Sequence, residues 1–408
     1  MESSSSWKRT VWILWFGSLL TNASYTMVVP FLPLYLVQEL GVAKADANWW
    51  AGIIFSVSFL VGAIMAPVWG ALADKNGKKK AILRAGFSLF IVYSLGAFVH
   101  SPWELLAVRV MHGLVAGFVP ASMAIVASTT PEEEMGWSLG LMQTAGATGS
   151  ILGPLMGGVL AEVFGMRLSF IASGVSVLIA TLFVMKFVQE SKPAPSKQRT
   201  RVLDDVKVAW NNRPMLRTLG ILIVFQTALA ILQPVLTLYV ADLQGSMDGS
   251  VLSSGLIFSL SGIAMIIAAP YWGRWGQKKG FRSTLLIALT GSGVLTLAQV
   301  LPDNLITFSV TRFAIGLFMA GILPACNAIV VENTELDFRG RAFGLTNSAN
   351  QIGSMIGPLI GGFLSGIVSI PFTFAITGVL LLINAGNVML WPRDPAKPVP
   401  QAKPAKSV

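Results

Sequence analysis

The chain contains little charge, almost no histidine and a single cysteine. Of its 408 residues 12% are charged, two are histidine, and Cys326 is the only thiol. A lone cysteine excludes an intramolecular disulfide and a cysteine-rich metal site. The phosphate-binding pattern G-x-x-x-x-G-K-[ST] is absent, and no polar stretch is long enough for a soluble ATPase domain. We therefore expect no enzyme activity, no metal and no cofactor, so any work must draw on an ion or substrate gradient.

Apolar residues, by contrast, are abundant and continuous. The chain is 54% hydrophobic, and its mean hydropathy is +0.68. A bilayer-spanning helix needs about 18 to 20 apolar residues. Ten charge-free windows approach or exceed that length: 10–38, 47–73, 85–103, 110–131, 135–161, 168–185, 218–241, 249–273, 283–302 and 313–331. The sequence predicts an all-α membrane protein.

The last charge-free window, Ala342 to Pro392, is long enough to cross the membrane twice. At about 1.5 Å per residue it exceeds two hydrocarbon thicknesses, and the stretch "SGIVSIP" from Ser365 to Pro371 offers a corner. Twelve transmembrane helices result. The stretch from Thr130 to Glu133 is interpreted as a capping box that starts the fifth helix with proline at its first position.

Basic residues predict the orientation. With both termini in the cytoplasm, 25 of the 29 lysines and arginines lie in cytoplasmic segments, and the outer loops keep only Lys44 and Arg167. This satisfies the positive-inside rule. The net charge of +10 therefore reflects topology, and we expect a multi-pass protein of the cell membrane with no nucleic-acid partner.

The two halves of the chain repeat each other. "GSILGPLMGG" from Gly149 recurs as "GSMIGPLIGG" from Gly353, and "AGIIFSVSFL" from Ala51 matches "SGLIFSLSGI" from Ser254. Six helices followed by six related helices form parallel repeats. We expect a six-helix bundle over 1–188, a cytoplasmic linker over 189–216 with an amphipathic helix at 202–210, a second bundle over 217–392 and a disordered tail over 393–408.

The stretch "GALADKNGKKK" from Gly70 to Lys80 joins the second and third helices. We expect the helix to end at Gly70 and the chain to turn at Gly77, followed by Lys78. Asp74 stands near the negative end of its own helix, where the dipole disfavours a carboxylate, so it needs a partner elsewhere. The alternative is that the lysines only fix topology. The second copy has Gln277 in place of the aspartate.

Arg109 stands about five residues inside the outer end of the fourth helix, and His112 follows one turn later. An arginine at membrane depth costs about 2.5 to 3.5 kcal/mol on insertion scales, which favours a functional role. The alternative is that it snorkels to the outer surface. His112 can titrate near neutral pH, unless it is a packed neutral side chain.

The repeated glycine pattern is the most specific signal in the sequence. It has the form G, eight residues, G, three residues, GP, two residues, GG. Glycines permit close helix contact and a proline permits a kink, as a moving interface requires, although static packing is the alternative. The pattern consists of Gly140, Gly149, Gly153, Pro154, Gly157, Gly158 and of Gly344, Gly353, Gly357, Pro358, Gly361, Gly362.

These motifs together resemble the major facilitator superfamily, in its twelve-helix drug/H⁺ antiporter branch. The resemblance covers nearly the whole chain. It implies a cytoplasmic gate at Gly70, Gly77 and Lys78, an antiporter motif at the glycine pattern, and proton coupling through Asp74, Arg109 and His112. The second copy of the glycine pattern departs from the family's usual single copy.

The resemblance implies proton-coupled export of amphipathic small molecules by a monomer that alternates its access around a central cavity. Amides inside predicted helices should face that cavity, or else bond between helices, and aromatic side chains would add apolar surface. The expected lining is Asn22, Tyr25, Phe55, Gln143, Phe225, Gln226, Gln233, Arg312, Asn347 and Gln351.

Two other functions remain open. Every Asp and Glu lies at or beyond a predicted helix end, whereas many multidrug antiporters carry a carboxylate inside the membrane. One alternative is therefore a facilitator or exchanger of a sugar or other metabolite with the same fold. The other, from a different class, is a membrane sensor or assembly protein without transport.

Overall fold

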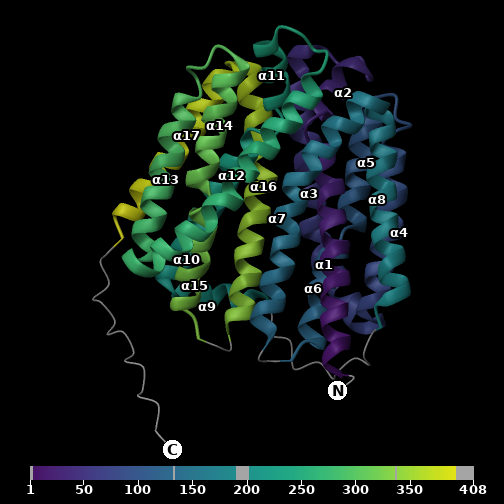
Figure 1. Cartoon of the computed structure of the whole chain (residues 1–408), viewed down its shortest axis with the longest axis vertical. Coiled ribbons are helices and arrows are strands. Elements are labelled where there is room, and N and C mark those ends of the chain that lie inside the picture. Colours follow the sequence, from purple (N-terminus) through teal and green to yellow (C-terminus); the bar gives the residue numbers. More distant parts are fainter. Residues whose placement is uncertain (1–2, 132–133, 190–201, 336–337, 392–408) are drawn as a thin grey trace, which may run out of the picture.

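The computed structural model describes residues 3–131, 134–189, 202–335 and 338–391, and every regular element in them is a helix (Figure 1). The first half holds α1 (Ser3–Met27), α2 (Leu32–Gln38), α3 (Lys44–Asn76), α4 (Lys78–Leu95), α5 (Pro102–Val115), α6 (Phe118–Thr129), α7 (Met135–Phe164) and α8 (Met166–Phe187). The second half holds α9 (Val202–Asn211), α10 (Arg213–Ile231), α11 (Leu236–Gln244), α12 (Ser250–Lys279), α13 (Phe281–Ala298), α14 (Leu305–Met319), α15 (Ile322–Glu332), α16 (Arg339–Ile367) and α17 (Ile370–Met389).

These helices supply the twelve expected membrane crossings. Nine spans pass a test of length and hydropathy, and α1 with α2 makes a tenth that is bent by 41°. The helices α4 and α16 complete the twelve. They are not among the nine because α4 begins with three lysines and α16 is rich in amides, which lowers their hydropathy. The corner expected at Ser365 to Pro371 is confirmed, because α16 ends at Ile367 and α17 begins at Ile370.

Four crossings are broken into two helices each, at matching places in the two halves. The breaks separate α1 from α2, α5 from α6, α10 from α11 and α14 from α15. Pro30 and Pro234 lie in the first and third of these breaks. Proline removes a backbone donor and interrupts the helix. At the second break Gly117 has a φ of +139°, which glycine adopts without steric cost.

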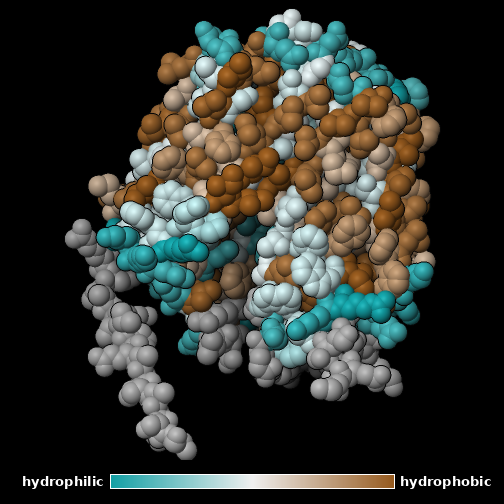
Figure 2. All heavy atoms as spheres, in the orientation of Figure 1, coloured by the Kyte–Doolittle hydropathy of each residue, from teal (hydrophilic) through white to brown (hydrophobic). Residues whose placement is uncertain are grey.

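On the face shown in Figure 2, apolar side chains cover the middle of the molecule. Hydrophilic residues gather at both ends, and the N-terminus lies at the lower end in Figure 1. We call this the N-terminal end of the molecule and its counterpart the opposite end. An apolar belt between two polar ends is the surface that a bilayer requires.

Two local expectations need correction. The second crossing does not end at Gly70, because α3 continues through Asn76 and stops at Gly77, whose φ of +101° ends the helix. Thr130 does not open the fifth crossing: it is the C-terminal cap of α6, and α7 begins at Met135. Glu132 and Glu133 lie outside the described residues.

The linker helix expected over 202–210 is present as α9, whereas α10 begins at Arg213, four residues before the expected bundle boundary at 217. The tail over 393–408 lies outside the described residues.

Candidate functional site

The two halves meet through two helix pairs that repeat the same contact. A Cβ on Gly52 of α3 would overlap the carbonyl oxygen of Pro358 on α16, and a Cβ on Gly255 of α12 would overlap that of Pro154 on α7. In both pairs the distance to the proline carbonyl carbon would be 3.2 Å. Backbone therefore lies directly on backbone at both crossings, which only glycine allows.

The glycine pattern divides its residues between two partners. Gly149, Gly153 and Gly157 of α7 lie against the backbone of α1, so they hold the first half together. Pro154 and Gly158 point to α12 in the other half. The same division holds on α16, where Gly353, Gly357 and Gly361 pack on α10, and where Pro358 and Gly362 face α3. Gly140 and Gly344 have nothing within 4 Å of an added Cβ, so the expected close packing does not extend to them.

The interface between the halves is tight only toward the opposite end. Eleven residues span about three helical turns and return to the same face within about 20°. Moving eleven residues toward the N-terminal end from the four contact positions gives Ala63, Gln143, Ile266 and Asn347, and all four are exposed. The surface is hollowed between the halves at this end (Figure 2). Gln143 and Asn347 therefore face an opening between the halves.

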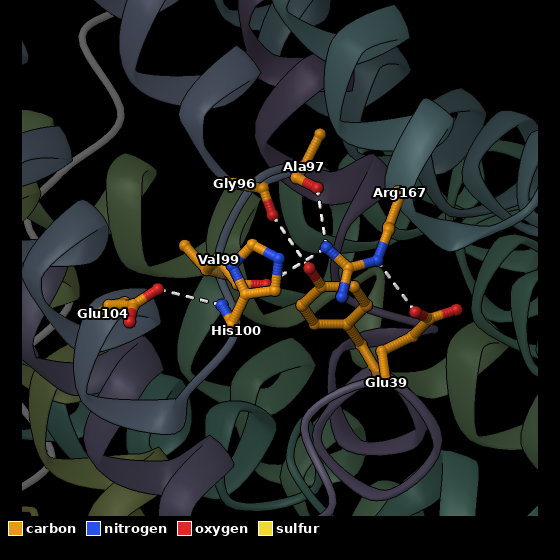
Figure 3. Close-up of polar contacts among 8 residues, drawn as sticks. Glu39, Gly96, Ala97, Val99, His100, Glu104 and Arg167 are labelled. Atoms are coloured by element: carbon orange, nitrogen blue, oxygen red, sulfur yellow. Dashed lines mark hydrogen bonds and ion pairs between the residues drawn. The ribbon is translucent and has the colours of Figure 1, made fainter.

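Two ion pairs lie at the opposite end. Lys44 at the start of α3 forms an ion pair with Asp242 in α11, which links the two halves. Arg167 at the start of α8 donates to Glu39 at 2.8 Å and to the carbonyls of Ala97 and Val99 at 2.9 and 3.1 Å (Figure 3). Both basic residues expected in the outer loops thus have an acidic partner.

Arg109 lies in a buried cluster of aromatic and polar side chains. It is 2% exposed, so it does not snorkel to the surface as the alternative required. The ring of His112 stacks on Tyr25 with centroids 5.6 Å apart, and its Nε2 lies 3.2 Å from the hydroxyl of Tyr93. The Nδ1 of His112 and the Nε and Nη2 of Arg109 are buried without hydrogen-bond partners among the described residues. We call Tyr25, Tyr93, Arg109 and His112 the histidine cluster.

The second half repeats the arginine of this cluster but not its aromatic residues. Arg312 is 7% exposed, and Ser261 donates to its carbonyl just as Ser58 donates to that of Arg109. The residues matching Tyr25, Tyr93 and His112 are Leu229, Thr296 and Ile315. The halves are therefore alike in packing and different in chemistry.

Sequence reasoning did not include Tyr93, Gly52 or Gly255 in the site. Only the repeat between "GIIFSVS" at 52–58 and "GLIFSLS" at 255–261 pointed to the two glycines.

The other amides expected in the cavity form two groups: Gln226 and Asn22 are hydrogen-bonded, whereas Gln233 and Gln351 are half-buried. Gln226 donates to Ser354 on α16 at 3.0 Å, and Asn22 donates to the Ser18 carbonyl of its own helix at 2.8 Å. Gln233 and Gln351 are half-buried, and the Oε1 of Gln233 is without a partner among the described residues.

Phe55 and Phe225 do not line an opening in this structure. Phe55 is 1% exposed and Phe225 is 0% exposed, and each lies in an apolar core cluster. Phe225 lies in a cluster of second-half residues, whereas the cluster around Phe55 also contains Leu238 and Val251 of the second half. Burial of apolar surface at both places stabilises the fold.

The junction of α3 and α4 contacts two other helices. Lys78 donates to the Ala124 carbonyl in α6 at 3.0 Å, and Lys79 donates to the Met185 carbonyl near the end of α8 at 2.9 Å. A cation at a helix C-terminus is favoured by the helix dipole, so these lysines have a packing role as well as a topological one. Asp74 is exposed in the last turn of α3.

The family assignment follows from comparison with known sequences. The model of the Major Facilitator Superfamily matches residues 14–253 and 239–407. The chain belongs to the major facilitator superfamily. It is 35% identical over 382 residues to the multidrug resistance protein MdtG of Salmonella arizonae, which covers 93% of this chain and 94% of that protein. Identity to MdtG of Proteus mirabilis is 34% over 383 residues, covering 93% of this chain and 95% of that protein.

Solved structures of this superfamily share the fold. The nucleoside transporter NupG superposes with a TM-score of 0.75 at 14% identity, covering 93% of this chain and 98% of that one. A D-xylose-proton symporter superposes with a TM-score of 0.76 at 14% identity, covering 93% and 96%. The all-α fold of two six-helix bundles is thus confirmed, and the chain is a multi-pass membrane protein of the superfamily fold.

Proposed function

We propose that this major facilitator protein exports amphipathic small molecules by alternating access, in exchange for protons. The observation that carries the proposal is the one-sided interface between the halves. Two backbone-on-backbone crossings close the opposite end, while the same helix faces are exposed at the N-terminal end. Rocking about the two crossings would close one end and open the other. The similarity to proteins named for multidrug resistance supports export of drugs.

The orientation of this opening follows from the basic residues. Lys75 lies in the last turn of α3, and Lys78, Lys79 and Lys80 form the first turn of α4 at the N-terminal end. The positive-inside rule therefore assigns that end and both termini to the cytoplasm. The conformation is then open to the cytoplasm, ready to receive a substrate for export. Since one chain supplies both faces of the opening, the transporter works as a monomer.

The histidine cluster is the proposed proton site. Within this cluster, His112 is the side chain whose ordinary pKa lies closest to neutral pH. Its two ring nitrogens have different surroundings: Nε2 lies beside the Tyr93 hydroxyl, and Nδ1 is buried without a partner among the described residues. Protonation would place a second positive charge beside Arg109, because the two residues are three positions apart on α5. That repulsion gives the cluster two states with different preferred packing.

Proton coupling is tested with purified protein in liposomes that contain a pH-sensitive dye. An outward gradient of a transported drug should drive proton uptake in the wild type. His112→Gln should abolish this uptake while leaving drug binding, and His100→Gln, a change of the other histidine at an exposed site, should leave it intact. Drug-driven proton uptake that persists in His112→Gln would remove His112 from the coupling path.

A facilitator or exchanger of a metabolite is the second candidate. Within the described membrane-spanning helices, every Asp and Glu lies within about one turn of a helix end: Asp46, Asp74, Glu104, Glu162, Asp242 and Glu332. A transporter without proton coupling needs no carboxylate at membrane depth. Drug or metabolite flux in the same liposomes with no proton movement would favour this function over antiport.

A further inference from the structure

A groove with mixed polar and apolar walls lies between α10 and α17, away from the interface of the two halves. It has a volume of about 410 Å³, and its walls are Arg217, Gly220, Ile221, Val224, Asn384, Asn387, Leu390 and Trp391. Arg217 is four residues after the start of α10, and Trp391 is two residues after the end of α17. The groove therefore lies at the N-terminal end of the membrane-spanning region, at the level where lipid headgroups meet the hydrocarbon.

The chain leaves the polar side of this groove available for a ligand. Arg217 is exposed and has no ion-pair or hydrogen-bond partner among the described residues. Gly220, one turn further along α10, has nothing within 4 Å of an added Cβ, which keeps the space beside Arg217 open. Asn384 donates to the Ile221 carbonyl at 3.1 Å and so joins the two helices behind the groove, while Asn387 is exposed.

The corresponding place in the first half is filled by aromatic side chains, and its one charged residue is Lys186, at the position of Leu390. At an offset of 204 residues, Phe16 occupies the position that corresponds to Gly220, and Phe183 the position that corresponds to Asn387. The centroids of the two phenylalanine rings are 5.8 Å apart. Ile13 and Ala180 stand for Arg217 and Asn384. The second half thus lacks the pair of phenylalanines that fills this place in the first half. It has instead one arginine and two asparagines.

We propose that this groove binds the headgroup of an anionic phospholipid. A guanidinium that has no partner among the described residues suits a phosphate, to which it can donate two parallel hydrogen bonds. The amide of Asn387 adds a further donor. Below the headgroup, Ile221, Val224 and Leu390 provide apolar walls for the first part of an acyl chain, and Trp391 lies where tryptophan is favoured, at the membrane–water interface. Basic pockets between transmembrane helices are known to hold anionic headgroups.

The proposal is tested on the full-length protein in detergent by native mass spectrometry. Phosphatidylglycerol and phosphatidylcholine with identical acyl chains are titrated separately. Arg217→Gln should weaken phosphatidylglycerol binding about five-fold, the change expected from one cation near an anionic headgroup. Gly220→Phe, which restores the phenylalanine found at this position in the first half, should abolish the site. Arg217→Lys keeps the charge but not the paired donors of the guanidinium, so its binding should fall between that of the wild type and that of Arg217→Gln.

Lys80→Gln is the matched control, because Lys80 is an exposed cation at the same end of the other half. It should leave phosphatidylglycerol binding unchanged. Equal loss in Lys80→Gln and Arg217→Gln, or equal binding of phosphatidylcholine, would show general attraction in place of a site and overturn the proposal. Displacement of bound phosphatidylglycerol by millimolar inorganic phosphate would assign the groove to a soluble anion, which also overturns it. None of these readouts depends on transport, so the proposal stands or falls separately from drug export.

Discussion

Replacing Gly255 by alanine should shift the transporter away from the conformation described above. The added Cβ would overlap the Pro154 carbonyl oxygen and lie 3.2 Å from its carbon and 3.3 Å from the Cα of Gly158. These distances are shorter than the optimum of about 3.5 to 4.0 Å between carbon atoms. All three atoms are backbone, so no side chain can rotate away, and α12 must move from α7 across the interface of the two halves.

The size of the shift in the conformational equilibrium follows from the free energy needed to fit an extra methyl group into a packed contact, which is about 1 to 3 kcal/mol. This corresponds to about a 5-fold to 150-fold change in the ratio of the two conformations. Alanine also favours helix over glycine by about 0.5 to 1 kcal/mol. Because α12 is helical in both conformations, that gain cancels in their ratio.

Thiol labelling measures the shift, because Cys326 is fully buried and adds little background. A cysteine in place of Asn347 reports on the open end, and one in place of Asn48 reports on the closed end. In Gly255→Ala the first should react more slowly with a maleimide and the second faster. Gly273→Ala on the same helix, where an added Cβ has nothing within 4 Å, should change neither rate. Unchanged rates in Gly255→Ala would refute the assignment of this crossing as the closed contact.

Three further results are expected. Arg109→Ala should abolish drug export, measured as dye accumulation in cells, without loss of protein from the membrane, and full export would remove Arg109 from the site. Lys44→Asp should increase labelling at the closed end by no more than about five-fold, because its ion pair with Asp242 is half exposed; the effect should fade in high salt, and adding Asp242→Lys should reverse it. Arg167→Gln should lower the free energy of unfolding by about 2 kcal/mol, because Arg167 loses hydrogen bonds to one carboxylate and two carbonyls. Thermal unfolding in detergent should show a clearly smaller loss for Lys44→Gln, and equal losses would contradict this ranking.

The candidate site was only partly predictable from residue types. Gln143 and Asn347 were placed near the central path from their matching positions in the two halves, and both face the opening. A functional role for Arg109 was predicted from the cost of a charge in lipid, with snorkelling as the alternative. Tyr93 was not predicted, because it comes from α4, 19 residues before the His112 that its hydroxyl contacts. Phe55 and Phe225 look the same as cavity aromatics in the sequence, and only the direction of each helix face puts them in a core.

The glycine pattern shows the same division. Its presence on α7 and α16 predicts close helix contact, since any helix with glycine at such spacing presents bare backbone. The pattern does not say which glycines contact which helix. Gly153 and Pro154 are adjacent, yet one faces α1 and the other faces the second half of the molecule, because successive residues of a helix point about 100° apart.

The residues alone were enough to predict twelve membrane crossings, duplicated halves and close helix contact at most positions of the glycine pattern. These properties depend on local runs of apolar residues and on comparison of the chain with itself. The tertiary structure decided which end of the interface is closed, which acidic residue pairs with Lys44 and where a groove opens beside Arg217. Each of these depends on contacts between segments far apart in the sequence, and a transporter that alternates between two conformations has more than one set of such contacts available to the same sequence.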